Sequence, residues 1–155
     1  MAEKQGLALP SVGQIGIVVK DVDKAVNYYS KVFGVGPFTI MNAVPKKHWV
    51  KGAPFPIKLK IALAKLGSIQ IELIEPLSDG PHKWFLDSNG EGLQHLGFYI
   101  DNYDEWINYL KQEGIGIFMN VEDDSEGMGH VRAAFMQSDK IGGVLIELIE
   151  VTSYK

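Results

Sequence analysis

The sequence predicts an α+β fold built from two tandem copies of a βαβββ unit, and three observations support this. Residues 143–150 form an apolar run of strand length that repeats the Ile-Glu-Leu-Ile-Glu core of residues 68–75. Residues 14–19 and 95–100 match position by position, 81 residues apart. Each member of this second pair is followed by apolar residues at helical spacing. A period this long that occurs only twice indicates a duplicated half-domain rather than a solenoid.

The first unit is expected to cover residues 12–76. Its opening strand alternates over residues 12–19, and Asp21 follows as the N-cap of a helix that Gly34 ends. Middle strands are expected over residues 38–44 and 57–65, before the strand that carries Glu72. The segment between the two middle strands is expected to be a basic loop, which contains Lys46, Lys47, His48, Trp49 and Lys51.

Residues 77–93 are expected to form a polar linker with a short apolar stretch at residues 84–86. The second unit then covers residues 94–152. Its helix is expected to begin with a capping box, in which Asn102 is the N-cap and Glu105 its partner, and to end at Gly114. Its middle strands are expected over residues 115–121 and 131–137, with an acidic loop, residues 122–127, between them. The 155 residues are therefore expected to form one domain.

The composition excludes several classes of protein. A net charge of −4 argues against a nucleic-acid partner, since such proteins usually carry a basic face. The absence of cysteine excludes a disulfide framework, a thiolate nucleophile and a zinc finger. No run has the length and apolarity of a signal peptide or a membrane span. We therefore expect a soluble, cytoplasmic protein that binds neither nucleic acid nor membrane.

Four polar side chains at matched positions of the duplication form the candidate site. Each repeated strand carries a carboxylate in an apolar setting, at Glu72 and Glu147, where an unpaired charge would be costly. Arg132, the only arginine, cannot pair with both. Gln14 and His95 occupy matched positions on the opening strands. If the units curl around a concave face, these groups converge, and the set of one imidazole, one amide oxygen and two carboxylates suits a divalent metal ion.

Each of these residues also has an ordinary structural interpretation. A glutamate within a strand is often paired with a basic residue of the core, and a single histidine is usually a satisfied structural residue. Only their joint placement at equivalent points of a repeat favours the metal site. His48 and His82 are expected at the surface in loops, and His130 at the edge of a strand, so none of these three is assigned a role.

With these residues in view, the chain resembles the vicinal-oxygen-chelate superfamily, which includes glyoxalase I, methylmalonyl-CoA epimerase, extradiol dioxygenases and bleomycin-resistance proteins. The resemblance spans residues 12–152 and implies a curved mixed sheet, an incomplete barrel around a metal site with the helices outside. Metal ligands on the first and last strands of each unit would be Gln14, Glu72, His95 and Glu147, a set found in some glyoxalase I enzymes. The segments that look closest to the epimerases are residues 72–77, 85–86, 90–95 and 142–147.

Three positions depart from the usual epimerase pattern. Gln14 stands where the epimerases usually have histidine, and Gln94 stands where they often have the first histidine of a pair. Residues 137–139 read Gln-Ser-Asp where a His-Pro-Lys stretch is common. These departures concern the substrate, whereas all four expected metal positions still carry groups that can bind a metal ion.

The resemblance implies a metal-dependent isomerase or epimerase that removes a proton α to a thioester carbonyl through a metal-stabilised enolate, as methylmalonyl-CoA epimerase does. Glu147 is the expected base, with Glu72 on the opposite side, and the ion would be Zn, Ni, Co or Mn. A glyoxalase I-like lactoylglutathione lyase and a non-catalytic antibiotic-binding protein are the alternatives. A homodimer is also expected, through helices that would turn Tyr28 and Trp106 outward. The basic loop is either a contact for the phosphates of coenzyme A or a solvated segment.

Overall fold

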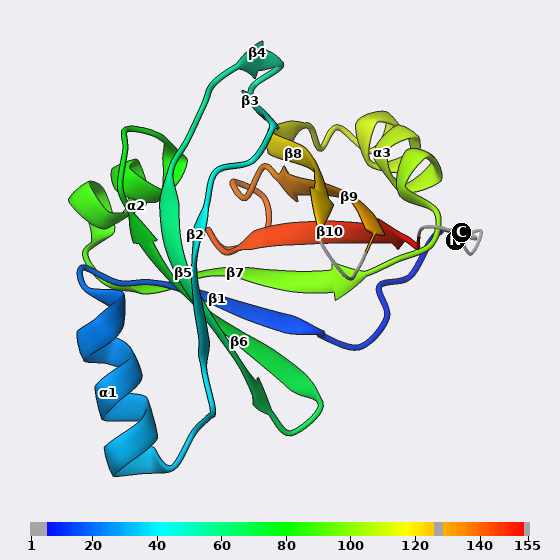
Figure 1. Ribbon diagram of the computed structural model, residues 1–155. Helices are drawn as coiled ribbons and strands as arrows, with labels where there is room; N and C mark the ends of the chain where they lie inside the picture. Colours follow the sequence, from blue (N-terminus) through cyan, green and yellow to red (C-terminus); the bar gives the residue numbers. More distant parts are fainter. Residues whose placement is uncertain (1–5, 126–128, 154–155) are drawn as a thin grey trace.

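The computed structural model describes residues 6–125 and 129–153, and within them the chain forms one curved mixed sheet of ten strands with three helices (Figure 1). The helices are α1 (Val22–Phe33), α2 (Pro81–Asn89) and α3 (Tyr103–Gln112). The strands are β1 (Gln14–Val18), β2 (Thr39–Ala43), β3 (Lys47–Val50), β4 (Ala53–Pro54), β5 (Leu59–Leu66), β6 (Ile69–Pro76), β7 (Gly92–Tyr99), β8 (Ile117–Ser125), β9 (Gly129–Met136) and β10 (Leu145–Thr152). The predicted α+β class is confirmed.

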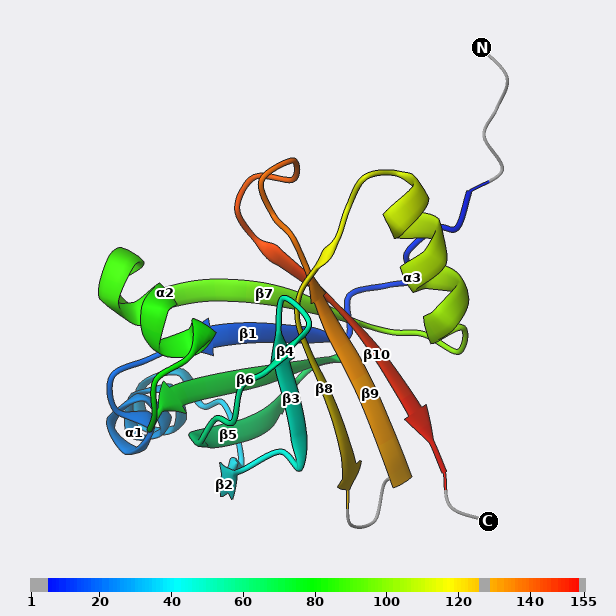
Figure 2. The ribbon, with the colours of Figure 1, turned by 90° about the horizontal axis from the view of Figure 1, so that it is seen from above.

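The sheet is organised around the antiparallel pair of β1 and β7. Its strand order is β2-β5-β6-β1-β7-β10-β9-β8-β3-β4. β1 pairs in parallel with β6, the last strand of the first unit, and β7 pairs in parallel with β10, the last strand of the second. The two units therefore repeat the same arrangement on either side of the β1–β7 pair, with β1, β7, β6 and β10 adjacent at the centre of the curved sheet (Figure 2).

The helices α1 and α3 cover the convex face of the sheet, and each packs on its own half. In the first half, Val22 and Ala25 of α1 pack with Ala62, Ile71 and Leu73 of the sheet. The second half is built in the same way from α3, with a buried cluster that includes Tyr103, Trp106, Ala134, Met136 and Leu148. Each half thus has its own apolar core on the convex side of the sheet. The concave face is left for the polar side chains of the candidate site.

The two glutamates of each repeated strand serve opposite faces. Because they are three residues apart, strand alternation sends the first toward the concave face and the second toward the helices. The Oε1 atom of Glu75 accepts a hydrogen bond from the Val22 backbone N–H at 3.2 Å, and Oε2 of Glu150 accepts one from the Tyr103 N–H at 3.1 Å. In each unit, the second glutamate therefore places a carboxylate at the N-terminus of a helix, where its charge is favourable.

The predicted start and end of α1 are confirmed. Asp21 Oδ1 accepts a hydrogen bond from the Lys24 N–H at 3.1 Å, and Gly34 ends the helix with φ of 67°. Asn102 is the N-cap residue of α3, as predicted, but the predicted capping bond is absent: its side chain makes no cap hydrogen bond, and its Nδ2 donates to Glu105 Oε2. A distant residue, Glu150, accepts a hydrogen bond from the first N–H of the helix, that of Tyr103.

Three segments predicted as loops contain regular structure. The expected linker holds α2, which begins at Pro81, a favourable residue for a first helical turn. The expected basic loop forms β3 and β4, and the acidic segment up to Ser125 is part of β8. β3 pairs with β8 so that Lys47 lies opposite Glu122. The two oppositely charged segments therefore form a pair of strands that joins the two units. Neither segment has a strand pattern when its sequence is considered alone. Residues 126–127 of the predicted acidic loop lie outside the described residues.

The predicted outward position of Trp106 is also wrong. Only 5% of its surface is exposed, since it fills the core beneath α3, whereas Tyr28 on α1 is 66% exposed. No helix among the described residues has both the length and the apolar character needed to cross a membrane.

We predict that Glu75→Ala lowers the free energy of unfolding by about 1 kcal/mol, because the Val22 N–H at the start of α1 loses its acceptor. Urea unfolding followed by circular dichroism measures this change. Glu75→Gln is the matched control: its amide oxygen can still accept the bond, so it should recover part of the loss. Equal stability of wild type and Glu75→Ala would show that the bond contributes nothing.

Candidate metal centre

The first glutamates of the repeat meet on the concave face of the sheet, at one side of a cavity of about 340 Å³. Gln14 reaches it from β1, Glu72 from β6 and Glu147 from β10. His95 of β7 lies directly behind them and has no exposed surface. Strands β6, β1, β7 and β10 are consecutive in the sheet, so each contributes one side chain to the same point.

The Nε2 atom of His95 is the centre of this group. It lies 3.2 Å from Gln14 Oε1, 3.6 Å from Glu72 Oε1 and 3.8 Å from Glu147 Oε2. Gln14 Nε2 donates to Gln70 Oε1 at 2.9 Å, which turns the amide oxygen of Gln14 toward His95. The structure therefore brings together all four side chains that the sequence nominated.

A second hydrogen bond, to an oxygen that can only accept, favours the tautomer of His95 with the proton on Nδ1. Nδ1–H donates to Gln94 Oε1 at 3.0 Å, and the Gln94 amide N–H donates to Nδ1 of His82 at 2.9 Å. With its proton on Nδ1, His95 turns the lone pair of Nε2 toward Gln14, Glu72 and Glu147. Four acceptors that face one point repel one another unless a cation or a shared proton lies among them.

A β-bulge makes the contact between Gln94 and His95 possible. In the β1–β7 pairing, Gly16 lies opposite His95 and Ile17 opposite Leu93, so Gln94 has no partner residue of its own. Such an extra residue redirects side chains locally. As a result Gln94 and His95 are both buried although they are neighbours in a strand, with 1% and 0% of their surface exposed.

Two glycines at matched positions make room for the ligands from the other unit. Gln14 pairs with Gly97, and His95 pairs with Gly16. A Cβ atom on Gly16 would overlap the His95 ring, and one on Gly97 would lie 3.0 Å from Cβ of Gln14. The repeated pattern of a polar residue followed two positions later by glycine thus has a steric reason, because each unit's glycine accommodates the other unit's ligand.

The two carboxyl groups of the site are largely shielded from solvent, and no lysine or arginine among the described residues pairs with either of them. Burial raises the pKa of Glu72 to about 7, and burial together with the charge of Glu72 raises the pKa of Glu147 well above its usual range. Burial, with a smaller effect of His82, lowers the pKa of His95 to about 3, so its ring is neutral. The possible alternative partner, Arg132, is engaged elsewhere: it pairs with Asp104 and Glu150.

The residues present suit a divalent cation, on the chemistry of the donor set. A neutral imidazole nitrogen, an amide oxygen and two carboxylates are ligands that Zn, Ni, Co and Mn accept, and two carboxylates balance the double charge of the ion. Within residues 6–125 and 129–153, no three or more His, Asp or Glu side chains are already arranged as a metal-binding group. The oxygens of Gln14, Glu72 and Glu147 converge on His95, at 3.2–3.8 Å from its Nε2.

Sequence reasoning missed two histidines. His48 and His82, expected at the surface, are only 6% and 5% exposed, and both line the cavity. Burial lowers the pKa of His82 to about 4 and also lowers the pKa of His48. His48 Nδ1 makes a hydrogen bond with the carbonyl oxygen of Phe55 at 2.9 Å. No local pattern identifies either residue, because each is buried by a segment that looked like a loop. His130 lies in β9, beside Glu122 and Asp124.

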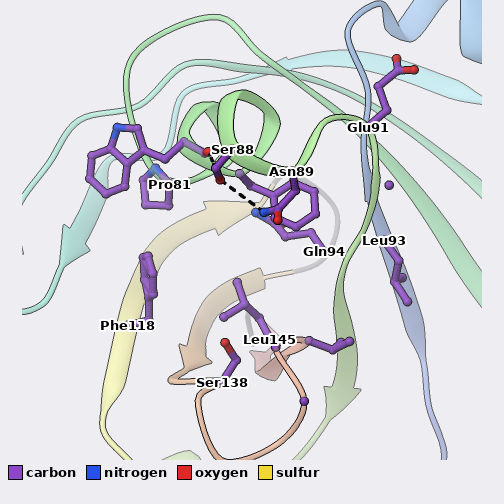
Figure 3. Close-up of a pocket in the computed structure, with 15 residues that line it drawn as sticks. Pro81, Ser88, Asn89, Glu91, Leu93, Gln94, Phe118, Ser138 and Leu145 are labelled. Atoms are coloured by element: carbon purple, nitrogen blue, oxygen red, sulfur yellow. Dashed lines mark hydrogen bonds between the residues drawn. The ribbon is translucent and has the colours of Figure 1, made fainter.

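A second, larger cavity of about 610 Å³ is lined in part by Gln94 (Figure 3). It is bounded by α2, the start of β7, Phe118 of β8 and the turn before β10. Its polar groups include Ser88, Asn89, Glu91 and Ser138. Gln94 therefore lines this larger cavity and also contacts His95 of the candidate metal centre.

Comparison with known proteins places the chain in a family. The model of the glyoxalase/bleomycin resistance protein/dioxygenase superfamily matches residues 13–135. The chain belongs to this superfamily. The resemblance drawn from the repeats and the four polar positions is thereby confirmed.

Named relatives of this superfamily member include proteins with and without an assigned activity. It is 29% identical to the uncharacterized protein YqjC of Bacillus subtilis over 137 residues, covering 88% of this chain and 89% of that one. It is 28% identical to the mitochondrial methylmalonyl-CoA epimerase of Bos taurus over 145 residues, covering 90% and 74% of the two chains.

Solved structures give the same fold. The hypothetical protein BH1468 of Bacillus halodurans matches with a TM-score of 0.70 at 25% identity, covering 94% of this chain and 96% of that one. Methylmalonyl-CoA epimerase of Mycobacterium tuberculosis matches with a TM-score of 0.67 at 24% identity, covering 96% and 94%. The relatives from Bos taurus and Mycobacterium tuberculosis are named as epimerases, and at this distance the reaction of this chain has to be argued from its site.

We predict that Gly16→Ala weakens the binding of Mn²⁺ or Co²⁺ at least tenfold and lowers the free energy of unfolding by about 1–3 kcal/mol, because the added methyl group displaces the His95 ring. Isothermal titration calorimetry and urea unfolding measure the two effects. Gly116→Ala is the control, since its added methyl group would meet only the flexible side chain of Gln137, at 3.3 Å. Unchanged metal affinity in Gly16→Ala would contradict this account of the site.

We predict that Glu72→Gln changes how stability depends on pH in the presence of a chelator. A glutamate whose pKa is raised to about 7 contributes most to stability below pH 4.5, and this contribution is lost as pH rises through 7. The variant should therefore match wild type near pH 4.5 and exceed its stability by about 2–3 kcal/mol at pH 8. Thermal unfolding across this range measures the difference, and a difference that is constant with pH would refute it. Added divalent cation should favour wild type.

Proposed function

We propose that the chain is a metal-dependent isomerase or epimerase that removes a proton from the carbon α to a thioester carbonyl. One observation carries the proposal: Gln14, Glu72, His95 and Glu147 converge at one side of a cavity large enough for a small acyl group. The similarity to the bovine epimerase supports it. A further fold relative, methylmalonyl-CoA epimerase of Streptomyces coelicolor, has a structure in complex with 2-nitronate-propionyl-CoA.

In this proposal the four converging side chains hold one divalent ion, Zn, Ni, Co or Mn. Gln94 keeps the proton of His95 on Nδ1 and so keeps Nε2 free to bind. Gln70 orients the amide of Gln14 in the same way. A bound ion would supply electrostatic stabilisation of the negative charge that develops on the substrate carbonyl oxygen.

The proton transfer is assigned to the two glutamates. Glu147 accepts the α-proton: the C–H bond breaks, an O–H bond forms on the carboxylate, and the electron pair moves toward the carbonyl oxygen. Glu72, which must hold a proton as a carboxylic acid at the start of this step, delivers it to the opposite face of the carbon: its O–H bond breaks, a new C–H bond forms, and the configuration inverts. Because Glu72 and Glu147 reach His95 from strands on opposite sides of the β1–β7 pair, they approach a bound group from two directions. The cavity around them is mostly apolar, which favours proton transfer by limiting access of water.

The proposal predicts that the purified protein, loaded with Mn²⁺, Co²⁺, Ni²⁺ or Zn²⁺ in turn, exchanges the α-proton of an acyl-CoA for deuterium in D₂O. Nuclear magnetic resonance of methylmalonyl-CoA and of further 2-methylacyl-CoA thioesters measures the exchange. Glu147→Gln should lower the rate at least 100-fold, since general base catalysis contributes about this much, while the fold is retained.

Glu105→Gln is the matched control, because this glutamate lies on α3, exposed and away from the cavity. Equal rates in Glu147→Gln and wild type would refute the role of Glu147. Formation of lactoylglutathione from the glutathione adduct of methylglyoxal, without α-proton exchange in any thioester, would favour the lyase reaction. Tight ligand binding without turnover of either substrate would indicate a binding protein.

A further inference from the structure

Most of the side chains that line the cavity beside the candidate metal centre are apolar. Two arms of the sheet enclose it, β2, β5 and β6 on one side and β8, β9 and β10 on the other. The apolar lining residues are Met41, Ala43, Pro45, Ile57, Leu59, Ile61, Leu63, Ile74, Val121, Val131, Ala133, Phe135, Ile149 and Val151. Both arms therefore present aliphatic or aromatic side chains to whatever the cavity holds.

The charges at the cavity are all negative. Among the described residues that line it, Glu72 and Glu147 are the charged ones, and none is Lys or Arg. The other polar lining groups are neutral or weakly basic: Gln14, His48, Gln70, His82 and Tyr99. Of these, Gln70 is already engaged by Gln14 Nε2 and by the Tyr99 hydroxyl, at 2.9 Å and 3.4 Å, and His48 by the Phe55 carbonyl.

Lys60, a basic residue that lies between two apolar lining residues of β5, faces away from the cavity. On β5, strand alternation places Leu59, Ile61 and Leu63 in the cavity lining and Lys60 on the convex face. There the Nζ atom of Lys60 pairs with Asp23 of α1 at 2.6 Å. Its charge is therefore directed to the outer surface, and the inner face of β5 is left apolar at these positions.

These features limit what acyl group the site can hold. A bound divalent ion is already balanced by the two carboxylates present, so a third carboxylate, brought in by the substrate, would have that ion as its sole cationic partner among the described lining and would add a net negative charge to a mostly apolar cavity. Burial of an unpaired charge is strongly unfavourable, whereas burial of apolar surface is favourable. The volume of about 340 Å³ corresponds to on the order of ten water-sized groups, enough for a branched or ring-bearing chain.

We propose that the site prefers acyl thioesters whose acyl group is uncharged and apolar, branched at the α-carbon, over those that carry a second carboxylate. This inference rests on the proposed function for its thioester substrate. The preference itself comes from the cavity walls, with Ile61 of β5 and Val131 of β9 as specificity-determining positions on the two arms.

Two thioesters that differ in this property test the inference. Binding of 2-phenylpropanoyl-CoA and of methylmalonyl-CoA to the protein loaded with Co²⁺ is compared by isothermal titration calorimetry, and α-proton exchange of both is followed in D₂O. Wild type should bind the phenylpropanoyl thioester at least tenfold more tightly. Equal or tighter binding of methylmalonyl-CoA would overturn the inference.

Ile61→Lys should reduce or reverse the preference by at least tenfold, because it adds a cation for the second carboxylate to the apolar wall. Its matched control, Ile61→Met, adds length without charge and should retain the preference for the apolar thioester. Val131→Lys repeats the test from the other arm, which keeps the inference testable if Ile61→Lys does not fold. If a folded lysine variant keeps the wild-type preference, the apolar lining does not set that preference.

The two proposals fail in different ways. If wild type exchanges the α-proton of methylmalonyl-CoA and binds it more tightly than the apolar thioester, the proposed function holds and the inferred preference is wrong. If neither thioester exchanges its proton but the apolar one binds more tightly and the lysine variants weaken it, the preference holds and the proposed reaction is wrong.

Discussion

The antiparallel pairing of β1 with β7 is the constraint on which the rest of the structure depends. It joins the two units in one sheet and places Gln14 beside Gly97 and His95 beside Gly16. The parallel partners of these strands, β6 and β10, then carry Glu72 and Glu147 to the same point. A shift of one residue in this register would place the side chains of one unit on the opposite face of the sheet from those of the other. The bulge at Gln94 adds a local correction, which allows a second buried polar group to hold the His95 ring.

The site places several polar groups where a core would usually be apolar. Two carboxylates and a neutral imidazole lie together without a basic residue beside them among the described residues, and such an arrangement destabilises a protein that binds no cation. The apolar cores under α1 and α3 lie on the other face of the sheet and are independent of this region. Within each repeated strand, the first glutamate faces the cavity and the second accepts a hydrogen bond from the first N–H of a helix. Stability and chemistry are thus assigned to opposite faces of the same strands.

Much of the fold and the four central residues could be predicted because the duplication provides an internal comparison. Gln14 with His95, and Glu72 with Glu147, become notable only as matched pairs. The predictions failed where a segment depends on a distant partner. The basic segment at Lys47 is a strand because the acidic segment at Glu122 pairs with it across the two units. The Asn102 side chain makes no capping bond at the start of α3, where Glu150 accepts from the Tyr103 N–H. His48 and His82 are buried for the same reason, because they lie in segments that were expected to be loops and that pack against distant parts of the chain.

The sequence by itself determined the repeat, the α+β class, α1 with its cap at Asp21, and the parity that sets the first and second glutamates of each strand on opposite faces. These are consequences of local periodicity and of residue type. Only the tertiary structure decided that His95 presents Nε2 to three oxygens, that Gln94 and His82 support it, and that the cavity walls are apolar and free of lysine and arginine among the described residues. Those properties depend on which strands pair and on how the sheet curves. The free energy that favours this arrangement comes from many contacts between residues that are far apart in the chain.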